Sequence, residues 1–247
     1  MKAYAITEKG KIEALEIAEP SIKSDEVLIE IYYVGLCGSD LSTYRGLNSL
    51  AAFPRIPGHE ISGIIIQKGG DVPSSLQVGD RATVSPYTHC GVCPACRAGR
   101  FNTCEFNQTL GVQRDGAMTL MISVPYEKVF ICKELSLEEL AIAEPLSVGY
   151  HAAKRAAVTE EDTVLVFGCG AIGLGAICAS VRKGARVIAA DIDDQKLEIA
   201  KKYGAASTVN TKKEDIKVLV AKLTQNEGVN VVIEAAGTEI TQRLAIE

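Results

Sequence analysis

The first half of the chain alternates short apolar runs with turn residues. Such runs stand at residues 3–6, 26–34, 63–68, 80–86, 118–125 and 127–131, with glycine or proline at most of the breaks. Short apolar runs bounded by turn residues are typical of β-strands. From Met1 to about Val129 the pattern therefore predicts a compact, mostly β domain.

A different pattern of apolar residues begins near Leu137. Apolar residues recur at helical spacing from Leu137 to Ala157, and strand-like and helix-like stretches alternate after Thr163. The strand-like stretches are 163–168, 186–191, 207–210 and 229–237, and the helix-like ones are 171–184, 193–205 and 213–226. This alternation predicts a doubly wound α/β domain with a parallel sheet. We expect two domains, residues 1–148 and 149–247.

The α/β half contains fewer strands than a complete doubly wound domain. Such a domain would continue after residues 229–237 with two more strands, whereas the chain stops at Glu247. We therefore expect a domain truncated at its C-terminus.

Composition and charge point to a small-molecule partner. The chain is 47% apolar over 247 residues, with a net charge of −5 and acids and bases interspersed. The absence of a basic block argues against nucleic acid or a membrane surface as partner. Met1–Gly10 lacks the apolar stretch of a signal peptide, and no apolar run approaches the length needed to span a bilayer, so we expect a cytoplasmic protein.

Four cysteines stand close together in the run HCGVCPACRAGRFNTC. They are Cys90, Cys93, Cys96 and Cys104, out of eight cysteines in the chain. Two-residue spacers in a loop turned by glycine and proline allow the sulfurs to converge on one tetrahedral zinc ion, which leaves no position for substrate. We expect a structural zinc site. The alternative is a pair of disulfides, which a reducing compartment disfavours.

A glycine motif marks a dinucleotide site. Gly168, Gly170 and Gly173, with Ala171 and Ile172 between the last two, form G-x-G-x-x-G between a predicted strand and a predicted helix. The glycines permit a tight turn and close approach of a pyrophosphate to the helix N-terminus. Asp191 ends the next strand, where a carboxylate accepts bonds from ribose hydroxyls and repels a 2′-phosphate. We expect NAD rather than NADP as cofactor, with Lys196, and also Asp193, near the ribose.

A second metal site is indicated by Cys37 in VGLCGSD, His59 and Glu60 in IPGHEISG, and Glu144 in AEPLSVG. One thiolate, one imidazole and one or two carboxylates would make a mixed-ligand zinc site with an open position for water or substrate. Each residue also has an ordinary interpretation: Cys37 as a packed thiol, His59 as a hydrogen-bonded turn residue, and Glu144 as a helix-start carboxylate.

The motifs GHEISGIIIQKGGDV, VGDR, CGVCPACRAGRFNTC, EPLSVGYHA and GCGAIG occur in this order, and the chain resembles the zinc-containing medium-chain alcohol and polyol dehydrogenases. The resemblance covers essentially the whole chain. It implies a GroES-like catalytic domain followed by a Rossmann domain, with one catalytic and one structural zinc. It makes Cys37 and His59 ligands of the catalytic zinc, with Glu60 or Glu144 completing the shell directly or through water.

The resemblance also implies a reaction, hydride transfer from a secondary alcohol to NAD. Ser39 matches the hydroxyl relay position, while Ser42 stands where many relatives have a histidine. The EPLSVG and GHE pair is similar to the branch that acts on polyols, sugar acids and threonine. We expect a polyol or sugar-acid substrate, with Arg114 a weaker hint of a substrate carboxylate, and a homo-oligomer at full length. The alternatives are a non-catalytic zinc and nucleotide binder, or a threonine or simple-alcohol dehydrogenase.

Overall fold

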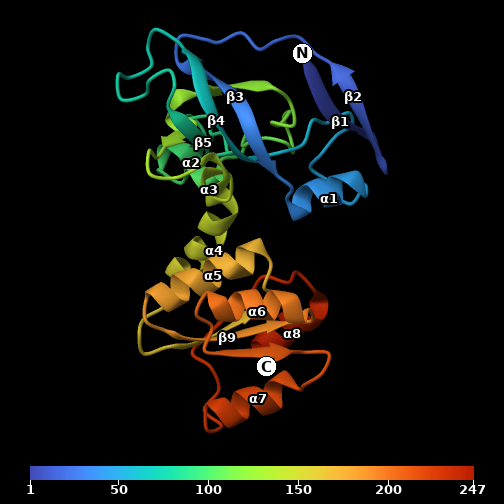
Figure 1. The fold of residues 1–247 in the computed structure, drawn as a ribbon, viewed down its shortest axis with the longest axis vertical. Helices are drawn as coiled ribbons and strands as arrows, with labels where there is room; N and C mark the ends of the chain where they lie inside the picture. Colours follow the sequence, from blue (N-terminus) through green and yellow to red (C-terminus); the bar gives the residue numbers. More distant parts are fainter. The chain divides into compact units, whose positions relative to one another are not determined.

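The computed structural model describes all 247 residues, and they form two compact units (Figure 1). The first unit comprises Met1–Glu144 and the second Pro145–Glu247. No helix is long and apolar enough to cross a membrane.

The first unit is built mainly of antiparallel strands. Five of them form a sheet in the order β6-β3-β4-β5-β7, and β1 and β2 pair separately. The strands are β1 (Lys2–Glu8), β2 (Lys11–Glu16), β3 (Glu26–Gly35), β4 (Glu60–Lys68), β5 (Arg81–Val84), β6 (Met121–Pro125) and β7 (Val129–Ile131). Val27, Ile29, Ile61 and Ile65 lie in the buried core of this unit, which explains why β3 and β4 are the most apolar stretches of the first half.

Short helices connect these strands. They are α1 (Gly38–Tyr44), α2 (Pro94–Arg97), η1 (Phe101–Thr103), η2 (Tyr126–Lys128) and α3 (Leu137–Ala141). Helix α3 begins with a capping box, because the Ser136 side chain accepts the Glu139 N–H and the Glu139 carboxylate accepts the Ser136 N–H. The boundary between the two units falls in the first turn of α4 (Ala143–Arg155).

The second unit is a parallel sheet with helical connections, as the alternating pattern predicts. Its strand order is β10-β9-β8-β11. The strands are β8 (Thr163–Phe167), β9 (Arg186–Asp191), β10 (Ser207–Asn210) and β11 (Val231–Glu234), and the helices after α4 are α5 (Ala171–Arg182), α6 (Asp194–Lys202), α7 (Ile216–Leu223) and α8 (Glu239–Ile246). Strand β11 pairs with β8, Val231 lying opposite Val164. The predicted mixture of a mostly β domain and a parallel-sheet α/β domain is therefore confirmed.

The pattern did not predict the short helices of the first unit that precede α3, nor strand β2 and helix α8. Strand β2 is mostly exposed and polar, so its alternation is weak, and it forms because the tight turn at Gly10 folds it back on β1. Helix α8 contains no buried residue, and Thr238 starts it by accepting the Thr241 N–H. In both cases a turn or a cap defines the element more strongly than an apolar face does.

Candidate active site

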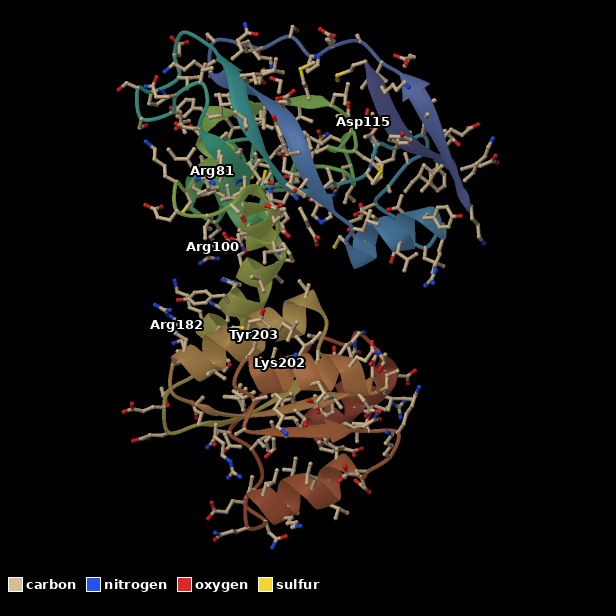
Figure 2. All side chains as sticks on the ribbon, in the orientation of Figure 1. Arg81, Arg100, Asp115, Arg182, Lys202 and Tyr203 are labelled. Atoms are coloured by element: carbon tan, nitrogen blue, oxygen red, sulfur yellow. The ribbon has the colours of Figure 1, made fainter.

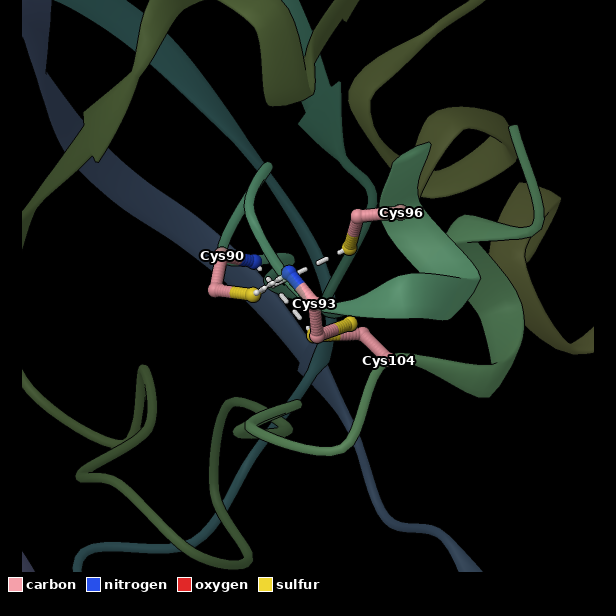
Figure 3. Close-up of side chains that lie close together, drawn as sticks. All are labelled: Cys90, Cys93, Cys96 and Cys104. Carbon is pink, nitrogen blue, oxygen red and sulfur yellow. Dashed lines mark hydrogen bonds between the residues drawn. The ribbon is translucent and has the colours of Figure 1, made fainter. Parts of the chain in front are cut away.

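The four lobe cysteines converge on one point. Their sulfur atoms all lie within 4.8 Å of one another, and Cys90 Sγ is 3.9 Å from Cys96 Sγ (Figure 3). All eight cysteines of the chain are unbridged. The convergence arises locally, because Pro94 starts α2 immediately after Cys93 and Gly91 adopts a left-handed φ of +74°.

Backbone N–H groups of the lobe point at the sulfur atoms. Cys90 N–H donates to Cys104 Sγ and Cys93 N–H donates to Cys90 Sγ, each at 3.3 Å. The N–H groups of Cys96 and Glu105 lower the pKa of the Cys93 thiol to about 6. Burial has the opposite effect on Cys96 and raises the pKa of its thiol to about 12, so the backbone donors favour the thiolate at Cys93 and not at every sulfur of the lobe. Zinc binds thiolates, and the convergence of the four sulfurs is what fits a metal site.

His89 adjoins the lobe but lies outside its sulfur cluster. Lys128 Nζ is 2.8 Å from His89 Nδ1, and the His89 ring packs against Phe101 in a tilted arrangement, with 4.6 Å between the ring centroids and 40° between the ring planes. His89 precedes the first cysteine and Phe101 lies shortly before the last, so this ring pair joins the two ends of the lobe. The geometry gives His89 a packing role.

A second group of ligand atoms forms where β3 and β4 pair. The candidate ligand atoms of Cys37, His59 and Glu60 lie within 4.8 Å of one another. Gly35 is the register partner of Glu60, so the pairing of the two strands brings the segment after β3 against the start of β4. A Cβ atom at Gly35 would lie 2.3 Å from Glu60 Oε2, which shows that the missing side chain makes room for the carboxylate.

The charges around His59 favour a cation at this position. His59 is only 6% exposed, and its Nδ1 has no hydrogen-bond partner. Burial lowers the pKa of His59, but the hydrogen bond and charge of Cys37, with the charges of Asp40 and Glu144, leave it raised overall. Burial raises the pKa of Glu144, which His59 partly offsets. An orphaned buried nitrogen among a thiol and carboxylates suits zinc.

Asp40 is a residue that the sequence reasoning missed. It is 6% exposed, and its carboxylate accepts the Cys37 N–H at 2.9 Å and the Gly58 N–H at 3.3 Å. It therefore binds together the two segments that carry Cys37 and His59. The available signal was its place three residues after Cys37, the N3 position of α1, where an acid reaches back to the N-cap backbone.

Asp115 contacts the segment before His59, and Ser39 and Ser42 lie in α1, directly after Cys37. Asp115, labelled in Figure 2, accepts hydrogen bonds from Arg55 Nη1 at 2.8 Å and from the Ile56 N–H at 3.1 Å, which anchors the segment before His59. Ser39 Oγ is buried and has no hydrogen-bond partner, whereas Ser42 Oγ donates to the Gly38 carbonyl at 3.0 Å.

Arg114 is half-buried, and the structure shows what acts on it. Burial lowers the pKa of its guanidinium, and the charge that opposes this effect is that of Glu26 at the start of β3. Cys37 follows the opposite end of that strand. The charge that acts on Arg114 therefore belongs to a residue at one end of β3, and Cys37 follows the other end.

In the second unit, the glycine motif forms the turn from β8 into α5. Gly168 has a φ of +86°, and Gly170 is the N-cap of α5, followed by Ala171 and Ile172 in its first turn. A Cβ atom at Gly173 would lie 1.7 Å from the Gly168 carbonyl oxygen. The third glycine therefore permits the close packing of helix against turn that this motif requires.

Asp191 lies at the end of β9 with its carboxylate held by backbone donors. It accepts the Cys169 and Ile192 N–H groups at 2.7 Å each and the Asp193 N–H at 3.0 Å. The charges of Asp191 and Lys196 both act on the Cys169 thiol, so Lys196 approaches the same turn. Asp193 instead caps α6, accepting the Gln195 N–H at 2.8 Å.

Comparisons with known proteins identify both halves of the chain. Residues 23–134 match the alcohol dehydrogenase GroES-like domain, and residues 171–247 match the zinc-binding dehydrogenase family. A sorbitol dehydrogenase of Bacillus subtilis is 39% identical over 100% of this chain and 71% of its own length. An L-idonate 5-dehydrogenase of Vitis vinifera is 38% identical over 92% of this chain and 64% of its own length. The chain thus spans about two thirds of these relatives.

Solved structures agree with these matches. The galactitol-1-phosphate dehydrogenase of Escherichia coli has a TM-score of 0.91 and 35% identity, with coverage of 100% of this chain and 71% of that one. A dehydrogenase of Escherichia coli complexed with NADH has a TM-score of 0.91 and 31% identity over 100% of this chain and 72% of that one. A zinc-binding dehydrogenase of Sinorhizobium meliloti bound to NADP has a TM-score of 0.90 and 30% identity over 99% and 72%. Zinc and a nicotinamide dinucleotide are the cofactors that these findings support, and the chain belongs to the zinc-binding medium-chain dehydrogenases, the family of alcohol and polyol oxidoreductases.

Proposed function

We propose that this protein oxidises a secondary alcohol of a polyol or a sugar acid with NAD as hydride acceptor. The observation that carries the proposal is the convergence of Cys37, His59 and Glu60 within 4.8 Å, near the half-buried carboxylate of Glu144, whose charge acts on His59. The relatives named as sorbitol and L-idonate dehydrogenases support the substrate class. Sugar acids are the first choice and sorbitol-like polyols the second.

Cys37 and His59 would hold the catalytic zinc, with Glu60 or Glu144 completing its shell directly or through water. When bound, zinc supplies Lewis acidity that lowers the pKa of an alcohol hydroxyl. Asp40 keeps the Cys37 and His59 segments together, and Gly35 leaves the space into which the Glu60 carboxylate fits.

Ser39 would receive the proton that leaves the alcohol. Its hydroxyl is buried without a partner, so both its donor and its acceptor capacity are free for a substrate oxygen and the next relay group. Ser42 does not continue the relay, because its hydroxyl is engaged with the Gly38 carbonyl and cannot hold a proton at neutral pH. Water or the Glu144 carboxylate would accept the proton instead.

Asp191 would select NAD. Three backbone N–H groups fix the orientation of its carboxylate and its negative charge at the end of β9. A 2′-phosphate would meet that charge, whereas ribose hydroxyls can donate to its remaining lone pairs. Lys196 would bind the ribose from α6. The turn formed by Gly168, Gly170 and Gly173 would hold the pyrophosphate at the N-terminus of α5.

The lobe formed by Cys90, Cys93, Cys96 and Cys104 would hold a second, structural zinc. Four sulfurs fill a tetrahedral shell, so this ion would take no part in the reaction. Its contribution would be to the folding free energy of the lobe.

A turnover assay tests the proposed reaction. The zinc-loaded protein should reduce NAD with sugar acids or polyols at a higher kcat/KM than with ethanol. Cys37→Ser should abolish turnover while the protein stays folded and keeps its lobe zinc. A higher kcat/KM for ethanol than for every polyol and sugar acid would show that the substrate assignment is wrong.

A further inference from the structure

Asn210 is a buried polar residue of the second unit to which the proposed function gives no role. It ends β10, is 7% exposed, and lies opposite Asp191 in the register of the parallel pair β9 and β10. The Thr211 N–H donates to the Asp191 carbonyl oxygen at 3.0 Å, so the two strands stay joined to their ends. Asn210 therefore lies beside the loop that begins at Asp191.

The Asn210 side-chain amide is hydrogen-bonded through both its nitrogen and its oxygen. Its Nδ2 donates to the Ile192 carbonyl oxygen at 3.3 Å and to Asp194 Oδ1 at 2.7 Å. Its Oδ1 accepts the Lys212 N–H at 3.1 Å. These partners fix the orientation of the amide, because exchanging its oxygen and nitrogen would set oxygen against two acceptors and nitrogen against a donor. One side chain of β10 thus holds the loop that follows β9.

The loop held in this way contains the donors that orient the Asp191 carboxylate. Asp191 Oδ1 accepts the Ile192 N–H at 2.7 Å and the Asp193 N–H at 3.0 Å. Asn210 bonds to the carbonyl of the first of these residues and to the side chain that follows the second. If the loop moved, Asp191 Oδ1 would lose both N–H groups, and the Cys169 N–H at Oδ2 would remain.

A second contact on the loop is weaker. Lys213 Nζ lies 2.7 Å from Asp194 Oδ2, but the two side chains are 63% and 61% exposed. An exposed ion pair contributes little to stability, whereas a buried donor or acceptor left without a partner is costly. The position of the loop therefore depends more on Asn210 than on Lys213.

We propose that Asn210 is a positioning residue for cofactor selection: it holds residues 192–194 so that the Asp191 carboxylate keeps the orientation that favours NAD over NADP. The inference rests on the proposed function of Asp191 and adds a residue that acts through it. Without the Asn210 amide, ribose hydroxyls would lose a fixed acceptor, and a 2′-phosphate would no longer meet a fixed charge. NAD should therefore bind more weakly, while NADP binding changes less.

Calorimetric titration of the zinc-loaded protein with NAD and with NADP tests the proposal. Asn210→Leu keeps the approximate size of the side chain and removes its donor and acceptor. We expect about tenfold weaker NAD binding and a ratio of the two dissociation constants that narrows about fivefold. Asn230→Leu is the matched control, because its Oδ1 accepts the Thr163 N–H at the start of β8, the opposite end of the same parallel sheet. It should lower the melting temperature without changing the ratio.

An exchange of the two side chains decides the case in which Asn210→Leu does not fold. Asn210→Asp sets a carboxylate against Asp194 Oδ1, which lies 2.7 Å from the present donor, and should weaken NAD about tenfold. Adding Asp194→Asn restores a donor and an acceptor at the net charge of the unmodified protein, so most of the NAD affinity should return. Equal NAD affinity in the single and the double variant would overturn the positioning role.

Asp191→Ala separates this inference from the proposed role of Asp191. If Asp191→Ala narrows the ratio and Asn210→Leu does not, Asp191 selects the cofactor without Asn210, and only this inference is wrong. If neither variant changes the ratio, the selecting role of Asp191 is wrong, and this inference with it. A ratio narrowed in both variants and unchanged in Asn230→Leu supports both.

Discussion

Replacing Gly35 by alanine should disable the proposed catalytic centre from a neighbouring strand. The new Cβ atom would lie 2.3 Å from Glu60 Oε2 and 2.9 Å from Glu60 Cβ. Ordinary contact begins at about 3.4 Å, so the carboxylate oxygen must move by about 1 Å. A misplacement of that size at a catalytic group costs roughly 100-fold in rate. Overpacking adds about 1–3 kcal/mol of destabilisation.

The assay combines kcat/KM for a polyol or sugar acid with metal analysis and a thermal melt. We expect Gly35→Ala to lose about 100-fold in kcat/KM while the lobe zinc stays bound. Gly70→Ala is the control, because a Cβ atom there meets nothing within 4 Å. If Gly35→Ala keeps full activity and full zinc at the second centre, the placement of Glu60 in that centre is refuted.

Three further predictions concern the metals, the cofactor and a thiol. Metal analysis should find two zinc ions per chain and about one in Cys37→Ser. Cys93→Ser should fold poorly, because zinc in a structural site contributes folding free energy. One zinc ion per fully loaded chain would contradict the two-site assignment. Asp191→Ala should weaken NAD about tenfold or more and narrow the NAD to NADP affinity ratio in titrations, whereas an unchanged ratio would count against Asp191 as the selecting residue. Burial and the Asp191 charge raise the pKa of the Cys169 thiol to about 12, and Cys169 is 1% exposed. Iodoacetamide at pH 8 should therefore label Cys169 far more slowly than the partly exposed Cys132 in a peptide-mapped time course. Equal labelling rates would show that the turn opens readily.

The sequence indicates the lobe, the glycine turn and the parallel sheet because their signals are local. Cys90 and Cys93 need only a short turned loop to meet, and Gly168 with Gly173 need only a strand followed by a helix. The parallel pairing of β11 with β8 is of the same kind, because each parallel connection has one preferred hand. Such features depend on residues a few positions apart or on connections with one preferred handedness.

The second centre depends on long-range pairing, which the alternation of residues does not specify. The register of β3 against β4 shifts twice, between Leu28 and Ile29 and between Ile31 and Tyr33. Because a shift of one residue moves a side chain to the other face of a sheet, no count along the two strands could have placed Gly35 opposite Glu60. The role of Asp40 was hidden for the same reason, since one of its partners, Gly58, is distant in the chain.

The first unit therefore brings its candidate ligands together through strand pairing and through hydrogen bonds to backbone N–H groups. Strand pairing places Glu60 against Gly35, and the Asp40 carboxylate accepts the N–H groups of Cys37 and Gly58. A site assembled in this way is held near its binding geometry before zinc arrives, so less ordering has to accompany binding than in the lobe, where short loop segments carry all four sulfurs. The two centres should accordingly differ in how they respond to metal loss: the lobe through folding, and the Cys37 centre through chemistry.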